Sequence, residues 1–383
     1  MIAVIADDLT GAAEVGGIGL QYGFTVEITT EVNVASTADL LVINTDSRSK
    51  GEPEAVIAVV KACKAIKALN PELIYKKIDS VMRGHVLAEL EAEMGILERT
   101  AALIIPANPH LGRNFVNNTY LINGVPVHQT SFAFDPEFPV SGCEAAQMLR
   151  ARHQPVEVRK HTELLPKSGI VVGEVETADD LNSWSTSINS THYLGGSSGF
   201  FSALLKSLPY ASSQKNSNYR LGKPVLFVSG TTFNVNTGKI KDYHQAGKPV
   251  SYMPKAIMYG QDAAIEIIDV WAAEIVNLLA QHGKALIAID QNMMPDANVT
   301  ALVLRRNMAA VVKQIFDNAN IEELIIEGGS TAAAILSSLN INTLFPVQEL
   351  APGIIRSRTM YPQNIHVTLK PGSYPWSEKL WSF

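Results

Sequence analysis

The chain has 383 residues, which is long for one domain and predicts two. Apolar residues make up 46% and charged residues 18%, a balance typical of a globular protein with a sizeable core. A formal charge of −6 argues against a broad nucleic-acid or membrane surface, although local Arg and Lys residues could still bind an anionic substrate.

The first half of the chain alternates apolar runs with helical patterns. Ile2–Ala6 is short and rich in β-branched residues, as expected of a strand buried on both faces. The pattern predicts further strands at 25–29, 39–44, 73–76 and 102–105, with helices at 12–22, 54–69 and 87–97. Strands that alternate with helices in this way are typical of a parallel, doubly wound sheet.

The middle of the chain is less regular. We expect a loop-rich excursion over 111–139, a strand at 169–175, and a strand followed by a helix across 192–205. Residues 209–224 are polar and lack an apolar pattern, which predicts a linker between domains at 1–208 and 225–383. In the second domain the pattern predicts strands at 225–228, 285–290, 324–326 and 366–369, with helices at 263–282 and 299–318.

Charged residues follow the predicted strands of the first domain. Ligands of doubly wound sheets bind beyond the carboxyl ends of the strands. The residues expected there are Asp7, Asp8, Asp46, Arg48, Asp79 and Arg83. Asp7 or Asp8 could accept a proton from a substrate hydroxyl. Asp8 could instead cap the following helix, and the two roles are compatible.

The segment Lys76–Gly84 places two Lys, an Asp and an Arg in one turn region. Its Arg and Lys side chains could clamp a carboxylate, the Arg through two parallel hydrogen bonds. A solvated charge cluster is the alternative. Arg48, which follows Asp46, fits the same carboxylate hypothesis.

Other polar residues carry weaker signals. One polar stretch contains Asn108, His110, Arg113 and Asn117. His85 and His128 are isolated, so we expect packing or hydrogen-bond roles and assign no metal ligand.

Three predicted strands of the second domain end in glycine with Ser or Thr, at 229–231, 328–331 and 372–373. Glycine lets backbone N–H groups approach an anion closely, and a helix expected from Thr331 adds the positive end of its dipole. Each turn alone could be ordinary turn chemistry, but three at one sheet edge favour a nucleotide phosphate site. Neither a Walker A sequence nor G-x-G-x-x-G occurs.

Two features concern the compartment. Cys63 and Cys143 are too few for a disulfide framework and lack metal-ligand spacing. The first residues lack the basic start and cleavage site of a signal peptide, and no apolar run approaches the roughly 20 residues of a membrane span. We therefore expect a soluble, cytoplasmic protein without nucleic-acid or membrane partners.

The chain resembles the four-carbon acid sugar kinase family in a series of motifs. They are Ala6-Asp-Asp-Leu-Thr-Gly11, Lys77-Ile-Asp-Ser-Val-Met-Arg-Gly84, Pro106-Ala-Asn-Pro-His-Leu-Gly-Arg113, Gly124-Val-Pro126, Gly196-Ser-Ser-Gly199, Val228-Ser-Gly-Thr231, Glu327-Gly-Gly-Ser-Thr331, Ala351-Pro-Gly353 and Lys370-Pro-Gly-Ser-Tyr-Pro-Trp376. The motifs span nearly the whole chain in the family's order, which is far more specific than any one of them.

The resemblance implies a sugar-acid-binding domain followed by an ATP-binding domain, and phosphorylation of the terminal hydroxyl of threonate, erythronate or 3-oxo-tetronate. The implied acid-site residues are Asp7, Asp8, Arg48, Lys77, Asp79, Ser80, Arg83 and Gly84. The implied ATP-site residues are Ser229, Gly328, Gly329, Ser330, Thr331 and Gly372. ATP would bind as its Mg²⁺ complex, Arg83 and Lys77 would fix the substrate carboxylate, and domain closure would exclude water.

Many relatives carry Asp or Glu where this chain has Ser330, which cannot act as a carboxylate base. We therefore place the general base at Asp8, as a hypothesis. The fold class expected is α/β, with two domains, each a mostly parallel sheet flanked by helices, and the active site in the cleft between them. An aldolase, a dehydrogenase or a nucleotide-sensing protein remains an alternative, and a homodimer is left open.

Overall fold

The computed structural model describes residues 1–135, 138–151, 155–187, 191–211, 219–230, 234–258, 264–290, 300–360, 362–372, 374, 376 and 380. The chain divides into two compact units, residues 1–214 (unit 1) and 215–383 (unit 2). In the described part, no helix is both long and apolar enough to cross a membrane. Part of the predicted linker, 212–218, lies outside the described residues, so its limits stay a prediction.

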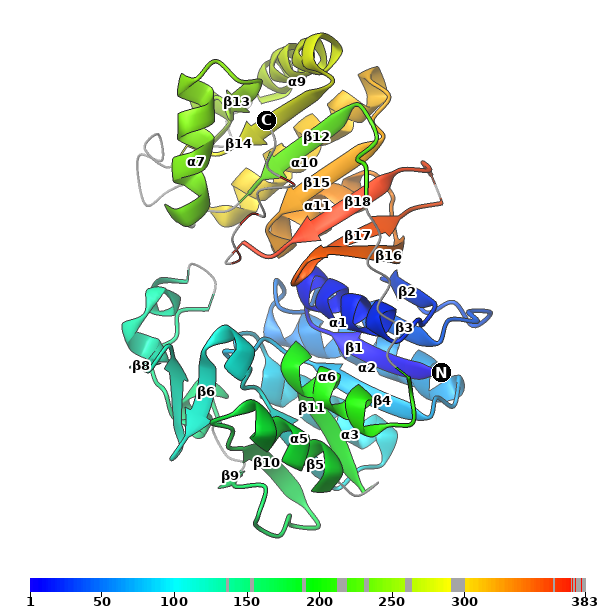
Figure 1. The fold of residues 1–383 in the computed structure, drawn as a ribbon, viewed down its shortest axis with the longest axis vertical. Coiled ribbons are helices and arrows are strands. Elements are labelled where there is room, and N and C mark those ends of the chain that lie inside the picture. Colours follow the sequence, from blue (N-terminus) through cyan, green and yellow to red (C-terminus); the bar gives the residue numbers. More distant parts are fainter. Residues whose placement is uncertain are drawn as a thin grey trace. The chain divides into compact units, whose positions relative to one another are not determined.

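Unit 1 is built on a parallel sheet with the strand order β2-β3-β1-β4-β11-β5-β10-β9 (Figure 1). Its strands are β1 (Ile2–Ala6), β2 (Val26–Thr29), β3 (Leu40–Asn44), β4 (Leu73–Lys77), β5 (Ala101–Ile105), β9 (Val156–Arg159), β10 (Gly169–Gly173) and β11 (His192–Gly196). Its α-helices are α1 (Leu9–Gln21), α2 (Glu52–Ala68), α3 (Val86–Leu97), α4 (Ala145–Met148), α5 (Ala178–Ser187) and α6 (Ser198–Ser207). The predicted parallel sheet is confirmed, with strand and helix limits mostly within two or three residues.

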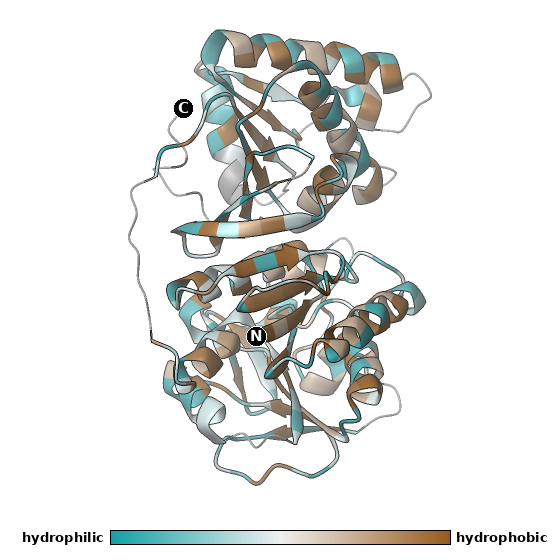
Figure 2. Ribbon diagram, turned by 90° about the vertical axis from the view of Figure 1, so that its right-hand side faces the viewer, coloured by the Kyte–Doolittle hydropathy of each residue, from teal (hydrophilic) through white to brown (hydrophobic). Residues whose placement is uncertain are grey.

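Packing of α2 shows why this sheet is stable. Val59, Cys63 and Ile66 recur at helical spacing and are fully buried against Ala3 and Ile5 of β1 and the neighbouring β3. Alternate residues of β1 are buried against the opposite face, so the strand is apolar throughout. Figure 2 shows this difference between strands and helices: the strands are hydrophobic over most of their length, whereas the helices carry both hydrophobic and hydrophilic residues.

The expectation of a loop-rich excursion over 111–139 is wrong in one respect. The segment contains a second, antiparallel sheet of β6 (Arg113–Val116), β7 (Thr119–Ile122) and β8 (Val125–Pro126). Three short 3₁₀ helices accompany it, at Pro109–Leu111, Val127–Gln129 and Ser131–Phe134. The strands are too short for a clear period, but turns at positive φ join them, at Asn117-Asn118 and Asn123-Gly124. Asn123-Gly124 is the hairpin signal that could have predicted the β7–β8 turn.

Unit 2 has the strand order β13-β14-β12-β15-β18-β17-β16, parallel as far as β18 and antiparallel beyond it. Its strands are β12 (Val225–Ser229), β13 (Val250–Tyr252), β14 (Lys284–Ala288), β15 (Glu323–Glu327), β16 (Thr343–Ala351), β17 (Ile354–Arg358) and β18 (His366–Lys370). Its helices are α7 (Asn234–Gln245), α8 (Lys255–Met258), α9 (Ala264–His282), α10 (Ala301–Asn318) and α11 (Gly329–Ser338). Helix α11 begins two residues before the expected start at Thr331.

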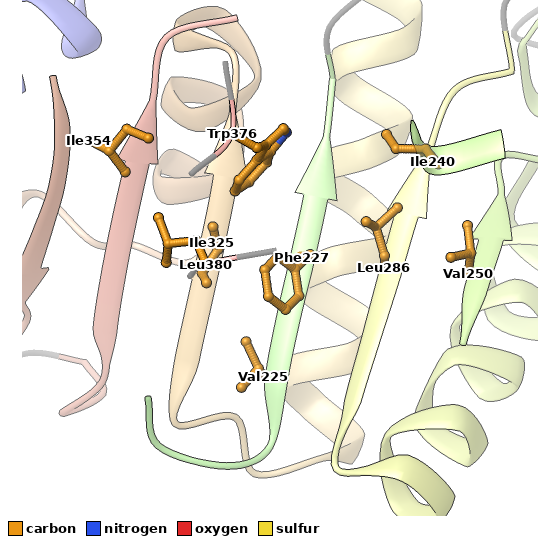
Figure 3. Packing of buried hydrophobic residues seen from close by; sticks show 10 residues of the cluster. Val225, Phe227, Ile240, Val250, Leu286, Ile325, Ile354, Trp376 and Leu380 are labelled. Carbon is orange, nitrogen blue, oxygen red and sulfur yellow. The ribbon is translucent and has the colours of Figure 1, made fainter. Parts of the chain in front are cut away.

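Trp376 and Leu380 pack against buried side chains of this sheet. Figure 3 shows Phe227 of β12 between Ile325 of β15 and Leu286 of β14, with Trp376 and Leu380 packed over them. The rings of Phe227 and Trp376 are 6.2 Å apart. This apolar cluster fixes the central strands whose ends carry the glycine turns.

Candidate active site

Three neighbouring strands of unit 1 end at one edge of the sheet. β1 pairs in parallel with both β3 and β4, so their carboxyl ends lie together. Asp7 and Asp8 follow β1, Arg48 follows β3, and Lys77 is the last residue of β4. The structure thus brings together the charged residues that the sequence predicted at strand ends.

Arg48 binds both aspartates. Its Nε and Nη2 donate to Oδ2 and Oδ1 of Asp7, each at 2.9 Å, and its Nη1 donates to Oδ2 of Asp8 at 2.9 Å. The backbone of Gly84, at φ 93°, lies close to the aliphatic part of the Arg48 side chain. A Cβ at this position would lie only 3.3 Å from Cγ of Arg48. The three groups are largely buried, so the alternative of a solvated charge cluster does not hold at this edge.

Asp8 is the N-cap of α1. Its Oδ1 accepts the backbone N–H of Gly11 at 2.8 Å, and its Oδ2 accepts the hydroxyl of Thr10 at 2.6 Å. Burial, the largest influence, raises the pKa of Asp8, but Arg48, Lys77 and these hydrogen bonds outweigh it and hold the pKa below its usual value. Asp8 is therefore ionised at neutral pH.

Asp7 differs from its neighbour. Burial raises its pKa, Arg48 lowers it, and the negative charge of Asp8 raises it again, so that the pKa reaches about 6. Two adjacent carboxylates that share one arginine therefore titrate at different pH values, as in sites where like charges are held close together.

The two lysines that end β4 face opposite sides of the sheet, as successive strand residues must. Lys77 points toward α1, where its Nζ lies 3.7 Å from Oε2 of Glu14. A Cβ at Gly11 would lie 2.8 Å from this Nζ and 2.7 Å from Oδ1 of Asp8. The absence of a side chain at Gly11 therefore leaves room for the ammonium beside Asp8. Lys77 thus belongs to the site.

Lys76 does not belong to it. Its Nζ donates to Oε2 of Glu89 at 2.5 Å and to Oε1 of Glu93 at 2.9 Å, and all three side chains are buried. The hydroxyl of Tyr193 donates to Oε2 of Glu93 at 3.1 Å. Burial raises the pKa of Glu93, Lys76 lowers it and Glu89 raises it, to about 7. The cluster anchors α3 to the sheet.

Asp79 and Arg83 form a second pair within the turn after β4. Nε and Nη2 of Arg83 donate to Oδ2 and Oδ1 of Asp79 at 2.8 and 2.9 Å, and its Nη1 donates to Oδ2 of Asp135 at 2.7 Å. Burial raises the pKa of Asp79, but Arg83 and Arg48 overcome it and hold the pKa well below the usual value. Asp135 was missed in the sequence, because it lies 52 residues away from its partner.

Arg113 and Phe132 complete this part of the site. Nη1 of Arg113 donates to the hydroxyl of Ser80. The guanidinium carbons of Arg83 and Arg113 lie 5.2 and 5.7 Å from the centre of the same Phe132 ring, within the range of cation–π contacts. The sequence placed Arg113 only in a weak polar stretch, and nothing in the pattern marked Phe132.

The isolated histidines differ in what they contact. Nε2 of His85 lies 2.8 Å from the backbone oxygen of Lys50, and its ring meets Phe138 edge to face, so its predicted packing and hydrogen-bond role is confirmed. His128 has a buried Nδ1 without a hydrogen-bond partner in the described part of the chain. Among the described residues no three His, Cys, Asp or Glu side chains gather as metal ligands would.

In unit 2, the strands that carry the glycine turns are neighbours. β15 lies between β12 and β18 in a parallel arrangement, so their three ends meet at one edge, as the sequence predicted. Glu327, the last residue of β15, accepts the hydroxyl of Ser229 at 2.6 Å and the Nζ of Lys370 at 2.6 Å. All three side chains are buried, which ties the strand ends together.

The backbone at this edge suits an anion. Gly328 has φ 102° and caps α11 without a side-chain hydrogen bond, so side chains leave the first N–H groups of this ten-residue helix uncapped. A Cβ at Gly230 would lie 2.1 Å from Oγ1 of Thr331, so only glycine fits there. Gly329 and Ser330 form the first turn of α11, and Gly372 follows β18. The motif residues Thr231 and Ser373 lie outside the described residues.

A cavity of about 580 Å³ in unit 1 lies away from these groups. It is lined by Ile2 and Leu73, which begin β1 and β4, and by Tyr193 and Tyr210. It therefore opens at the amino ends of the strands, opposite the charged edge.

Comparison with known proteins identifies both units. Residues 2–204 match the model of a sugar-binding N-terminal domain, and residues 226–374 match that of a nucleotide-binding C-terminal domain. A D-threonate kinase of Salmonella typhimurium is 28% identical, over 92% of this chain and 89% of the relative. A D-erythronate kinase of Heliobacterium modesticaldum is 31% identical, over 39% of this chain and 36% of the relative.

The fold has solved counterparts as well. A Haemophilus influenzae protein of known structure superposes with a TM-score of 0.70 at 18% identity, over 97% of this chain and 96% of that one. The first family model alone covers more than half of the chain, and the second covers most of the remainder. The chain therefore belongs to the four-carbon acid sugar kinase family and is, at that level of description, a sugar-acid kinase.

Proposed function

We propose that this enzyme transfers the γ-phosphoryl group of ATP to the terminal C4 hydroxyl of a four-carbon sugar acid such as threonate, erythronate or 3-oxo-tetronate. The observation that carries the proposal is the chemistry of the two strand edges. Unit 1 has an edge of paired carboxylates and cations, and unit 2 has an edge of glycine turns and hydroxyls. The names of the relatives support the choice of acid.

The acid site would be formed by Asp7, Asp8, Arg48, Lys77, Asp79, Ser80, Arg83 and Gly84. Asp8 is the proposed general base. Its carboxylate is held by Arg48, Thr10 and the N–H of Gly11, so that it is fixed in one orientation. Its low pKa suits phosphoryl transfer, in which the hydroxyl proton leaves late and a weak base is sufficient. Lys77, close to Asp8, would place positive charge beside the reacting hydroxyl.

The nucleotide site would be formed by Ser229, Gly328, Gly329, Ser330, Thr331 and Gly372. The uncapped N-terminus of α11 and the glycine backbone fit the phosphates of ATP. Mg²⁺ bound to those phosphates would neutralise charge on the transferring group. Glu327 already accepts from Lys370 and Ser229, so the described residues favour a metal that is held mainly by the nucleotide.

The test is ADP release with Mg·ATP against D- and L-threonate, D- and L-erythronate, 3-oxo-tetronates and several five- and six-carbon acids. Release driven by one four-carbon acid, with phosphate found on C4 of the product, is the expected result. Nucleotide binding without release on any acid would instead favour a sensing protein, and release only on longer acids would exclude the four-carbon class.

A further inference from the structure

Three arginines lie among the residues of the proposed acid site, Arg48, Arg83 and Arg113, and they differ in their hydrogen-bond partners. All three guanidinium nitrogens of Arg48 donate to Asp7 or Asp8. Those of Arg83 donate to Asp79 and Asp135. These two arginines therefore have no nitrogen left without an acceptor, and their charges are compensated by carboxylates of the chain itself.

Arg113 is different. In the described part of the chain no carboxylate lies within 4.0 Å of its guanidinium, and its hydrogen-bonded partner is the neutral hydroxyl of Ser80. Its Nε and Nη2 have no acceptor among the same residues. The side chain is only half-buried, so the donors remain accessible to a small molecule.

The position of Arg113 is nevertheless fixed. The residue begins β6, and its backbone forms a two-way bridge with Asn108, with N···O distances of 2.9 and 3.1 Å. The buried Phe132 ring contacts the guanidinium of Arg113 and also that of Arg83. A cation held on an aromatic ring keeps its donors in plane and free for an oxyanion.

The hydroxyl groups of Ser80 and Tyr120 also have a proton without an acceptor among the described residues. Ser80 accepts from Arg113, and its own proton has no acceptor among the described residues. Tyr120 lies on the same face of the β6–β7 hairpin as Arg113, and its buried hydroxyl has no hydrogen-bond partner in that part of the chain. Burial raises the pKa of Tyr120, while the charge of Arg113 lowers it and that of Asp79 raises it.

We propose that Arg113, with the hydroxyl of Ser80, binds the carboxylate of the sugar acid, and that Arg83 positions the turn without touching the substrate. This rests on the proposed function, because it assigns one end of that substrate. A substrate carboxylate would supply the oxyanion that Arg113 lacks, through two parallel hydrogen bonds. It replaces the sequence hypothesis in which Arg83 and Lys77 held the carboxylate, since each guanidinium nitrogen of Arg83 already donates to Asp79 or Asp135.

The experiment compares Arg113→Ala and Arg113→Lys with the wild-type enzyme, using the four-carbon acid with the highest turnover and its neutral carboxamide. We expect Arg113→Ala to raise the KM for the acid about 10- to 100-fold, the effect of one charge-assisted hydrogen-bonded pair. The KM for ATP should stay within about 2-fold. The preference for acid over carboxamide should fall in the same proportion, with Arg113→Lys in between. Arg159→Ala, on the edge strand β9, is the matched control.

Two outcomes would overturn the proposal: an unchanged preference for the acid, or a rise in the KM for ATP equal to that for the acid. If the wild-type enzyme phosphorylates no four-carbon acid, the proposed function fails by itself. In that case the role of Arg113 is tested by binding alone. The measurement is the rise in melting temperature on adding D-threonate or D-erythronate without nucleotide. A rise in the wild type that Arg113→Ala abolishes supports it, and no rise, or an equal rise in both, refutes it.

Discussion

Nζ of Lys370 and Oε1 of Glu327 lie 2.6 Å apart at the ends of two neighbouring strands, and neither side chain is exposed to solvent. The ring of Trp376 lies 5.0 Å from the same Nζ. Burial lowers the pKa of Lys370, although Glu327 raises it. The pair therefore depends on each partner to keep the other charged inside the sheet.

Lys370→Met should destabilise unit 2 by roughly 3 to 5 kcal/mol, because it leaves Glu327 buried without a cation. The double variant Glu327→Leu with Lys370→Met should recover most of that loss, since no isolated charge remains. Urea unfolding of the single and double variants measures both. A double variant no more stable than Lys370→Met would contradict this account.

Asp8→Asn should lower kcat by about 10²- to 10⁴-fold, the usual contribution of a positioned general base. Asparagine caps helices as well as aspartate does, so α1 should remain folded. Nucleotide affinity, measured by calorimetry, should hardly change. Near-normal turnover in Asp8→Asn would remove Asp8 from the role of base.

Gly11→Ala tests the close approach of Lys77 to Asp8. A methyl group there would lie 2.8 Å from Nζ of Lys77 and 2.7 Å from Oδ1 of Asp8, so the ammonium and the carboxylate must move apart. We expect kcat to fall at least about 10-fold, because both groups would leave their present geometry. Gly95→Ala in α3, where a Cβ meets nothing within 4 Å, is the control and should keep full activity. Equal kcat in both variants would show that Lys77 needs no such proximity.

Glu93→Gln tests the buried cluster around Lys76 through its pH dependence. The pKa of Glu93 is raised to about 7 in the folded protein, from an ordinary value of 4.5. The folded state thus binds this proton more tightly than the unfolded state, so the stability that Glu93 contributes is present below pH 4.5 and is lost as the pH rises toward 7. The free energy of unfolding of Glu93→Gln, relative to wild type, should therefore rise by up to about 1.4 kcal/mol per pH unit in that window.

Urea unfolding at pH 5, 6, 7 and 8, followed by hydrogen exchange of peptides from β4, measures this in unit 1. Glu54→Gln, an exposed glutamate of α2, is the control and should run parallel to wild type. A Glu93→Gln curve that also runs parallel to wild type would mean that Glu93 titrates in the folded protein as it does in the unfolded chain.

Much of this architecture could be predicted from local patterns. Ile2–Ala6 and Leu40–Asn44 are continuous apolar runs, which only a strand buried on both faces accommodates, and acidic or basic residues directly follow them. That placed Asp7, Asp8 and Arg48 at one edge. The antiparallel β16–β17 pair gave no such signal, because Thr343–Ala351 mixes exposed and buried residues without strict alternation.

The pairing of charges could not be predicted. Which arginine binds which aspartate depends on side-chain directions across β1, β3 and the turn after β4, and no spacing in the sequence encodes them. Asp135 and Phe132 reach the site from an excursion whose hairpins are set by Asn turns rather than by an apolar period. Arg113 therefore seemed less important in the sequence than Arg83, although of these two it is Arg113 that lacks a carboxylate within 4.0 Å among the described residues.

The two adjacent lysines of β4 make this strand sensitive to its own register. A shift by one residue would send the ammonium that belongs with Glu89 and Glu93 toward Asp8, and would bury the other one against α3 in its place. One of the two lysines would then occupy the position of the other, and the remaining one would lie two residues away from its acidic partners. The register that places Lys76 against Glu89 and Glu93 is therefore also the one that places Lys77 beside Glu14 and Asp8, so a single strand alignment forms both the buried cluster and the charged edge.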